Sequence, residues 1–138
     1  MSDPLDFSGK AVLITGGSRG IGRGIAEAFL EAGAEVAVCG RKEPGDLPSA
    51  GGKTAIFLSA DVREAAQVEK LVDAVVDGFG RLDVLVNNAG GAPFAEAATA
   101  SPRFSEKVIQ LNLIAALHCA QHANRVLQQQ ESGGSIVN

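Results

Sequence analysis

The sequence TGGSRGIG occupies residues 15–22 and lies between a short apolar run and a helical pattern. The run, Lys10–Thr15 (KAVLIT), is rich in β-branched residues and predicts a buried strand. Apolar residues then recur at the spacing of one helical face: Ile21, Ile25, Ala28, Phe29 and Ala32. Gly33 follows in the C-terminal stop position, so the pattern predicts a helix of about three turns.

Three glycines stand at the turn between this strand and this helix. Gly16 would permit the tight turn, Gly20 would let the backbone approach a pyrophosphate, and Gly22 would let the helix pack closely. The helix N-terminus would present N–H groups and partial positive charge to the anion. A phosphate-binding loop is therefore predicted, with a simple turn as the alternative interpretation.

Apolar runs and helical patterns alternate over the rest of the chain. Further strands are predicted at Ala34–Gly40, Lys53–Ser59 and Asp83–Val86, and Ser135–Asn138 begins another. A loop rich in glycine, proline and charge is predicted over Arg41–Gly52. Since helices alternate with the strands, the connections are expected to be right-handed crossovers between parallel strands.

Two more helices carry recognisable start signals. Asp61 as N-cap with Glu64 three residues later gives a capping-box pattern. The apolar face that follows is Val68, Leu71, Val72, Val75 and Phe79. Ser101 as N-cap with Pro102 at the first helical position opens a long helix that is predicted to end at about Gln130. Its apolar face is Phe104, Val108, Leu111, Ala115 and Cys119. The sequence thus predicts an α/β fold, a doubly wound parallel sheet with helices on both faces.

Composition excludes several classes of function. With 46% hydrophobic and 20% charged residues, the chain has the composition of a globular domain. A net charge of −4 and scattered Lys and Arg argue against nucleic-acid binding. No stretch has the apolar length of a membrane span, and residues 1–9 are acidic where a signal peptide would be basic, so a cytoplasmic location is predicted.

Four residues could in principle form a disulfide or a metal site. Cys39 and Cys119 have no motif spacing and are predicted to be buried, reduced thiols. His118 and His122 share a helix face at i, i+4, but no third ligand or metalloprotease motif accompanies them. No metal site is predicted.

Four motifs, in order along the chain, resemble those of the short-chain dehydrogenase/reductase family. Residues 15–22 resemble its T-G-x-x-x-G-I-G motif, and Asn87–Gly90 match its N-N-A-G. Asp61 stands where the family has an adenine-contacting acid, and Asn112 where it has a helix asparagine. The resemblance implies a Rossmann-type sheet that stops at the start of its fifth strand, so that residues 1–138 would be a dinucleotide-binding half-domain without the catalytic segment.

The resemblance also implies which residues would bind a nicotinamide cofactor. They are the glycine loop at the phosphates, two residues at the adenine and three on the ribose side: Gly16, Ser18, Arg19, Gly20, Ile21 and Gly22, then Asp61 and Val62, then Asn88, Ala89 and Gly90. A structural role is the alternative for Asn87 and Asn88, whose side chains could simply tie neighbouring strands together.

The choice between the two nicotinamide cofactors is predicted from the tip of the second strand. An acid there would bind the adenosine ribose hydroxyls and repel a 2′-phosphate, but this chain has Gly40. Arg41 follows, and Arg19 lies in the glycine loop, so two guanidinium groups would favour the phosphate. NADP(H) is therefore predicted over NAD(H), with an ordinary solvated role as the alternative for Arg41.

The implied reaction is hydride transfer between nicotinamide and a small carbonyl or alcohol substrate. In the family a tyrosine moves the proton, a lysine lowers the pKa of that tyrosine and a serine holds the substrate oxygen. This chain has no tyrosine, and of the family's catalytic residues only Asn112 has a counterpart, with its backbone carbonyl implied to anchor a water. The 138 residues alone are therefore predicted to be inactive as a dehydrogenase.

Two further expectations concern what else the chain could be. A noncatalytic dinucleotide-binding fragment or redox sensor is the main alternative to an oxidoreductase, and an unrelated nucleotide-binding α/β protein is a lesser one. A fifth strand without its neighbours would expose an apolar sheet face and an edge, so association is expected. The family often pairs the long helix, here Pro102–Gln130, which implies a homo-oligomer.

Overall fold

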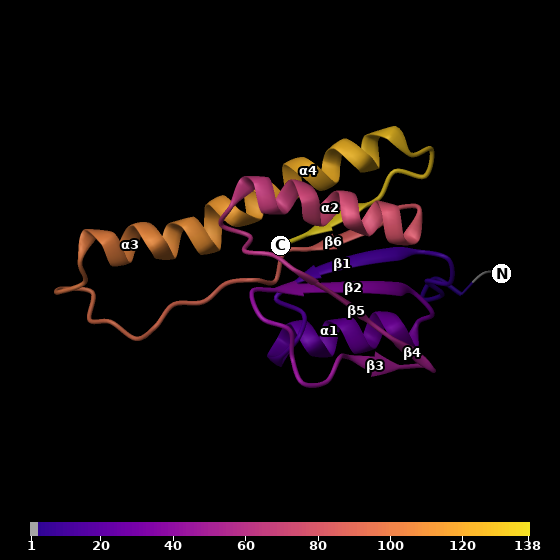
Figure 1. Cartoon of the computed structure of the whole chain (residues 1–138), viewed down its shortest axis with the longest axis horizontal. Coiled ribbons are helices and arrows are strands. Elements are labelled where there is room, and N and C mark those ends of the chain that lie inside the picture. The colour runs from indigo at the N-terminus through magenta and orange to yellow at the C-terminus, as the bar shows by residue number, and fades with distance from the viewer. Residues whose placement is uncertain (1–2) are drawn as a thin grey trace.

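A computed structural model describes residues 3–138, and its centre is a five-stranded sheet (Figure 1). The strands lie in the order β5-β2-β1-β6-β7, and all four neighbouring pairs are parallel. Their bounds are β1 Ala11–Thr15, β2 Glu35–Gly40, β5 Ile56–Ser59, β6 Val84–Val86 and β7 Ser135–Val137. The predicted α/β fold with a doubly wound parallel sheet is confirmed, including the strand at residues 135–137.

Helices cover both faces of the sheet (Figure 1). Helix α1, Gly20–Glu31, packs on one face, and α2, Ala65–Phe79, and α4, Ala115–Gln129, pack on the other. Successive residues of β1 contribute to the cores on opposite faces of the sheet: Leu13 packs with α2 and α4, whereas Ile14 packs with α1. Strands buried on both faces read as continuous apolar runs, which is why the residues of β1 carry no alternation.

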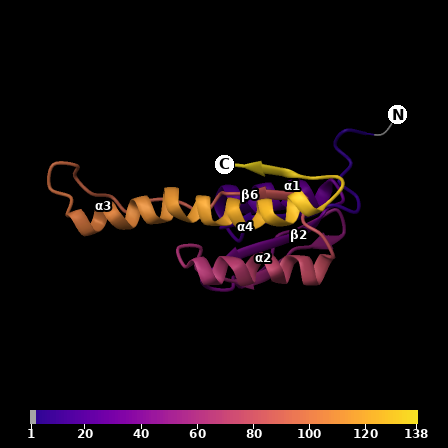
Figure 2. The same cartoon turned by 90° about the horizontal axis from the view of Figure 1, so that it is seen from above.

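The predicted long helix is formed but interrupted. Helix α3, Pro102–Ile109, passes into a π-helical segment η1, Gln110–Ile114, and then into α4. Ser101 caps α3 as predicted, because its Oγ accepts a hydrogen bond from the amide of Phe104 at 3.1 Å. Helix α3 projects away from the sheet in both views and has no buried residue (Figure 2).

The prediction of one strand over residues 53–59 and of a loop over residues 41–52 was partly wrong. Two short strands, β3 Ser49–Ala50 and β4 Lys53–Thr54, pair antiparallel, and β5 begins only at Ile56. Gly51 and Gly52 connect them with φ of +59° and +75°. A two-residue hairpin turn of type I′ needs positive φ at both central residues, so the Gly-Gly pair was the local signal for this turn.

The predicted capping box at Asp61 was also wrong. Helix α2 begins at Ala65 with Glu64 as its N-cap, and no side chain caps it. The Asp61 carboxylate instead binds Arg63, and the Asp61 amide donates to Gln67 Oε1 at 2.8 Å. The guanidinium of Arg63 donates to both oxygens of the carboxylate at once, which a single capping amide cannot do.

The two cysteines are buried free thiols, as predicted. Burial raises the pKa of Cys39 to about 12 and that of Cys119 to about 11, so both stay protonated at neutral pH. Among the helices of residues 3–138, none is both long and apolar enough to cross a bilayer.

Candidate functional site

A cleft of about 850 Å³ opens at the carboxyl edge of the sheet. The chain winds outward from β1 in one direction through β2 and β5, and in the other through β6 and β7. Ligands of open α/β sheets bind at the edge of such a switch point, between loops that diverge. The loops that follow β1, β2, β5 and β6 all contribute to the lining of this cleft.

All twelve of the residues predicted to bind the cofactor line this one cleft: Gly16, Ser18, Arg19, Gly20, Ile21, Gly22, Arg41, Asp61, Val62, Asn88, Ala89 and Gly90. The structure therefore brings together segments that are up to about 70 residues apart in the sequence. Sequence reasoning missed other residues of the lining, among them Cys39, Lys42, Arg63 and Leu111.

The glycine loop has a backbone that suits an anion. Gly16 and Gly20 have φ of +63° and +59°, a region that residues with a Cβ rarely adopt. Arg19 is the N-cap of α1 and no side chain caps this helix, so its first amides are available to a ligand. Gly22 packs so closely on the loop that a Cβ there would lie well inside 3.0 Å of Gly16 O.

A hydrogen-bond network ties the glycine loop to the segment after β6. The buried Thr15 Oγ1 accepts the amides of Asn88 and Ala89 at 3.1 and 3.0 Å. The Asn88 side-chain amide donates to the carbonyls of Thr15 and Gly16 at 3.1 and 3.2 Å. Asn88 therefore has the structural tying role that sequence reasoning left open, and it also lines the cleft.

Asp61 meets a partner that the sequence motifs did not indicate. Arg63 Nε donates to Asp61 Oδ1 at 2.9 Å and Arg63 Nη2 donates to Oδ2 at 2.6 Å. The hydrogen bonds from Arg63 hold the pKa of the Asp61 carboxyl below its usual value, against the effect of burial, and the charge of Arg41 acts in the same direction. The acid at the far side of the cleft is thus ionised and paired at neutral pH.

Positive charge dominates the rim of the cleft between β2 and the glycine loop. Arg19, Arg41 and Lys42 line the cleft there, and Glu43 is the acid among them. Within residues 3–138, no ion pair is formed by Arg19, Arg41 or Lys42. These three cations are exposed and can reach an anionic ligand.

Asn112 lies beside the end of the cleft, in η1. Its Oδ1 accepts the amide of Gly91 at 2.8 Å, and its Nδ2 donates to the carbonyls of Gly91 and Val108 at 2.8 and 2.9 Å. The side chain therefore joins the long helix to the segment after β6. Leu111, its neighbour in η1, lines the cleft.

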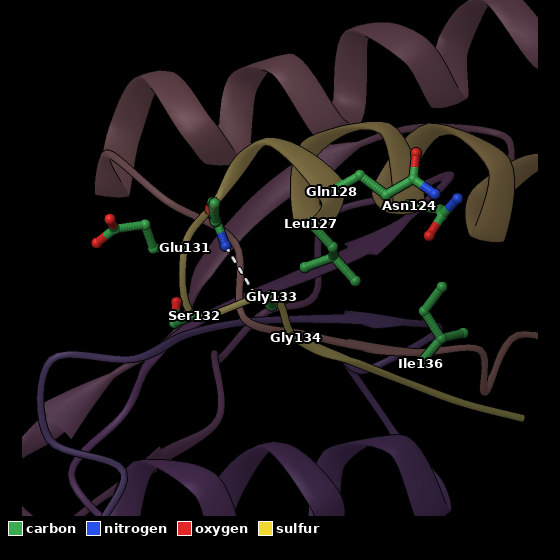
Figure 3. A pocket seen from close by; sticks show the side chains of 9 residues that line it. Asn124, Leu127, Gln128, Glu131, Ser132, Gly133, Gly134 and Ile136 are labelled. Atoms are coloured by element: carbon green, nitrogen blue, oxygen red, sulfur yellow. Dashed lines mark hydrogen bonds between the residues drawn. The ribbon is translucent and has the colours of Figure 1, made fainter.

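A second cleft of about 520 Å³ lies near the amino end of β7, whereas the first cleft lies at the carboxyl ends of the strands (Figure 3). It is open, and Leu127 and Ile136 form its apolar floor between polar side chains of α4. Gln130 Nε2 donates to the carbonyls of Gly133 and Leu82 there, which is a structural role. None of the predicted site residues reaches this cleft.

No group of three His, Cys, Asp or Glu side chains is close enough in residues 3–138 to hold a metal ion. His118 and His122 lie on α4, away from the cleft lining.

Comparison with known proteins identifies the family of the chain. The family model described as short chain dehydrogenase matches residues 10–138. An uncharacterized oxidoreductase of Methylorubrum extorquens is 40% identical over 139 residues, which cover 96% of this chain and 54% of that protein. An L-fucose dehydrogenase of Bos taurus is 36% identical, with 96% of this chain and 49% of that protein covered.

Solved structures agree with the sequence relatives. A short-chain type dehydrogenase/reductase from Mycobacterium marinum superposes with a TM-score of 0.87 at 32% identity, over 96% of this chain and 56% of that one. An NADH-dependent reductase in complex with NAD gives a TM-score of 0.83 at 32% identity, over 91% of this chain and 55% of that one. The chain spans about half the length of the curated relatives it matches. With its fold, its motifs and these matches in agreement, the chain belongs to the short-chain dehydrogenase family.

Proposed function

We propose that residues 1–138 are the dinucleotide-binding part of a nicotinamide-dependent oxidoreductase. One observation carries the proposal: the twelve residues named from sequence motifs line a single cleft at the switch point of the sheet. The uncapped amides of α1 would bind the pyrophosphate, Asp61 and Val62 would contact the adenine, and Asn88–Gly90 would lie on the ribose side. The close approach of Gly22 to Gly16 leaves the loop no room for larger residues.

The proposed reaction is hydride transfer between nicotinamide and a small carbonyl or alcohol substrate. The bound nicotinamide would supply the hydride chemistry, whereas the protein positions the ring and moves a proton. The 138 residues contain no tyrosine, so the family's proton-transferring tyrosine is not among them. Asn112 would anchor a water through its backbone carbonyl at the end of the cleft, where its side chain is hydrogen-bonded to Gly91.

NADP(H) is the proposed cofactor in preference to NAD(H). The tip of β2 is Gly40, so no carboxylate stands there to repel a 2′-phosphate. Arg19, Arg41 and Lys42 line the same rim, and the nearby Asp61 has its charge paired with Arg63. The relative solved with NAD shows that the fold also accepts the other cofactor, so the preference rests on these local charges.

Substitution of Arg41 by alanine tests the preference. In the full-length protein, Arg41→Ala is expected to weaken NADP(H) binding about 10- to 100-fold, because a hydrogen bond between two charged groups is lost. The affinity for NAD(H) should change little, because that cofactor lacks the phosphate. Isothermal titration calorimetry with both cofactors measures the ratio of the two dissociation constants.

Arg125→Ala is the control, since Arg125 is an exposed arginine of α4 outside the cleft. It should leave both dissociation constants as they are in the unmodified protein. An unchanged cofactor ratio in Arg41→Ala would defeat the proposed NADP(H) preference.

We also propose that the protein is a homo-oligomer in which copies pair through the long helix. Ile109, Leu113 and Leu117 form a stripe at four-residue spacing, and each is more than half exposed. An exposed apolar stripe of this kind is typical of a protein interface. Sedimentation equilibrium of the full-length protein should give a dimer or larger species, and Leu113→Glu should shift it towards the monomer; a monomer before substitution would contradict the proposal.

A further inference from the structure

Arg23, in the second turn of α1, is bonded to three separate segments. Its Nη1 donates to the carbonyl of Ser18 in the glycine loop at 3.5 Å. Its Nη2 donates to the carboxylate of Asp46 at 2.9 Å and to the carbonyl of Leu47 at 3.3 Å. Its Nε pairs with Glu27, one turn later in the same helix, at 3.0 Å. The guanidinium therefore bridges the glycine loop and the segment after β2.

That segment has no other anchor of this kind. Among the described residues, the hydrogen bonds made by residues 41–47 are the three that Arg23 donates to Asp46 and Leu47. The flanking bonds lie outside it, at the carbonyls of Gly40 and Pro48. A segment whose backbone carbonyls accept hydrogen bonds from one side chain alone depends on that side chain for its position.

The two segments joined by Arg23 carry the cations of the cleft. Arg19 belongs to the glycine loop, and Arg41 and Lys42 begin the segment after β2. Arg23 itself is absent from the lining of the cleft, and its side chain is 26% exposed. It can therefore act on a ligand only through the residues that it holds.

We propose that Arg23 is a positioning residue for cofactor discrimination, which holds the segment after β2 against the glycine loop so that Arg41 and Lys42 face the adenosine ribose. The inference rests on the proposed preference for NADP(H). A guanidinium is suited to this role because its planar fork can serve several carbonyl and carboxylate oxygens at once. A lysine at the same place would satisfy only part of the set.

The test compares Arg23→Gln, Arg23→Lys and the distant control Arg125→Ala in the full-length protein. Arg23→Gln is expected to weaken NADP(H) binding about 3- to 10-fold, which is in the lower part of the range for neighbouring residues that are energetically coupled. NAD(H) binding should change less than about twofold, because that cofactor lacks the phosphate that Arg41 and Lys42 would bind. Arg23→Lys should recover part of the loss, and Arg125→Ala should match the unmodified protein.

A double-mutant cycle separates positioning from a general structural effect. In a background that combines Arg41→Ala with Lys42→Ala, Arg23→Gln should have little further effect on NADP(H) binding, since both cations that it positions are absent. Cleavage by trypsin after Arg41 or Lys42 should be faster in Arg23→Gln, because the segment loses the bonds that hold it. If Arg23→Gln does not fold, Asp46→Asn is the second variant, because Asp46 is 83% exposed and its substitution removes only the ion pair with Arg23. Asp46→Asn should also weaken NADP(H) binding, by a smaller factor than Arg23→Gln.

Three outcomes would overturn the inference alone, and each is distinguishable from failure of the proposed function. An unmodified protein that prefers NADP(H), with a preference that survives Arg23→Gln and Asp46→Asn, overturns this inference alone. Equal losses for both cofactors, or the full loss in the background that lacks both Arg41 and Lys42, would also overturn it and assign Arg23 to general stability. An unmodified protein without cofactor preference would overturn both proposals.

Discussion

Gly22→Ala is expected to reduce dinucleotide binding below detection by calorimetry and to lower the free energy of unfolding by about 1–3 kcal/mol. The added Cβ would overlap Gly16 O and the Asn88 side-chain amide, which belong to the two loops that form the cleft. A backbone carbonyl cannot move aside as the end of a flexible side chain can. The glycine loop must therefore shift, and the amides at the start of α1 lose their arrangement. Calorimetry with NADP(H) and urea unfolding measure the two effects.

Gly24→Ala is the matched control, because it makes the same substitution two residues further along α1. No atom lies within 4 Å of a Cβ built at Gly24. Alanine there should stabilise the protein by up to about 1 kcal/mol through its higher helix propensity and leave binding unchanged. If Gly22→Ala behaved like Gly24→Ala in both measurements, close packing at Gly22 would be unimportant for the site.

Thr15→Val is expected to lower the free energy of unfolding by about 1–3 kcal/mol, because the Ala89 amide loses its acceptor and the Asn88 amide keeps only the carbonyl of Val86 at 3.1 Å. The hydroxyl of Thr15 accepts the amides of Asn88 and Ala89, and the side chain is 2% exposed. Valine keeps the shape of threonine but removes the acceptor, so the cost arises from unpaired polar groups rather than from a cavity. Dinucleotide binding should weaken as well, since Asn88 and Ala89 line the cleft.

Thr15→Ser provides the complementary control. It keeps the hydroxyl and removes one methyl group, so it should lower the free energy of unfolding by about 1 kcal/mol. The cofactor affinity of the Thr15→Ser variant should be close to that of the unmodified protein. Equal destabilisation by valine and serine, measured by urea unfolding, would contradict the assignment of the effect to the hydrogen bonds.

The fold could be predicted because local patterns and global architecture agree in this chain. The run Lys10–Thr15, the glycine turn and the helical face that follows specify one strand-turn-helix unit, and its repetition requires parallel strands. The lining of the cleft could be predicted for a related reason. Gly16 and Gly20 adopt positive φ and Gly22 packs closely on the loop, and these backbone requirements leave a characteristic glycine spacing in the sequence.

Contacts between side chains distant in sequence could not be predicted in the same way. The pairing of Arg23 with Asp46 joins residues 23 positions apart, and an arginine and an aspartate at this separation have no spacing that marks them as partners. Arg63 was missed because the acid before it already matched a capping box. The π segment at Gln110–Ile114 was missed because its residues continue the helical pattern of α3, although the bonds of Asn112 to Gly91 lie there.

A crystal structure of the full-length protein with NADP(H) tests the central claim most directly. The account predicts density for the pyrophosphate within hydrogen-bond distance of the amides of Gly20–Gly22, with the adenosine extending past Arg41 towards Asp61. Empty density at the glycine loop under saturating NADP(H) and NAD(H), or either cofactor bound instead in the cleft beside Leu127 and Ile136, would contradict it.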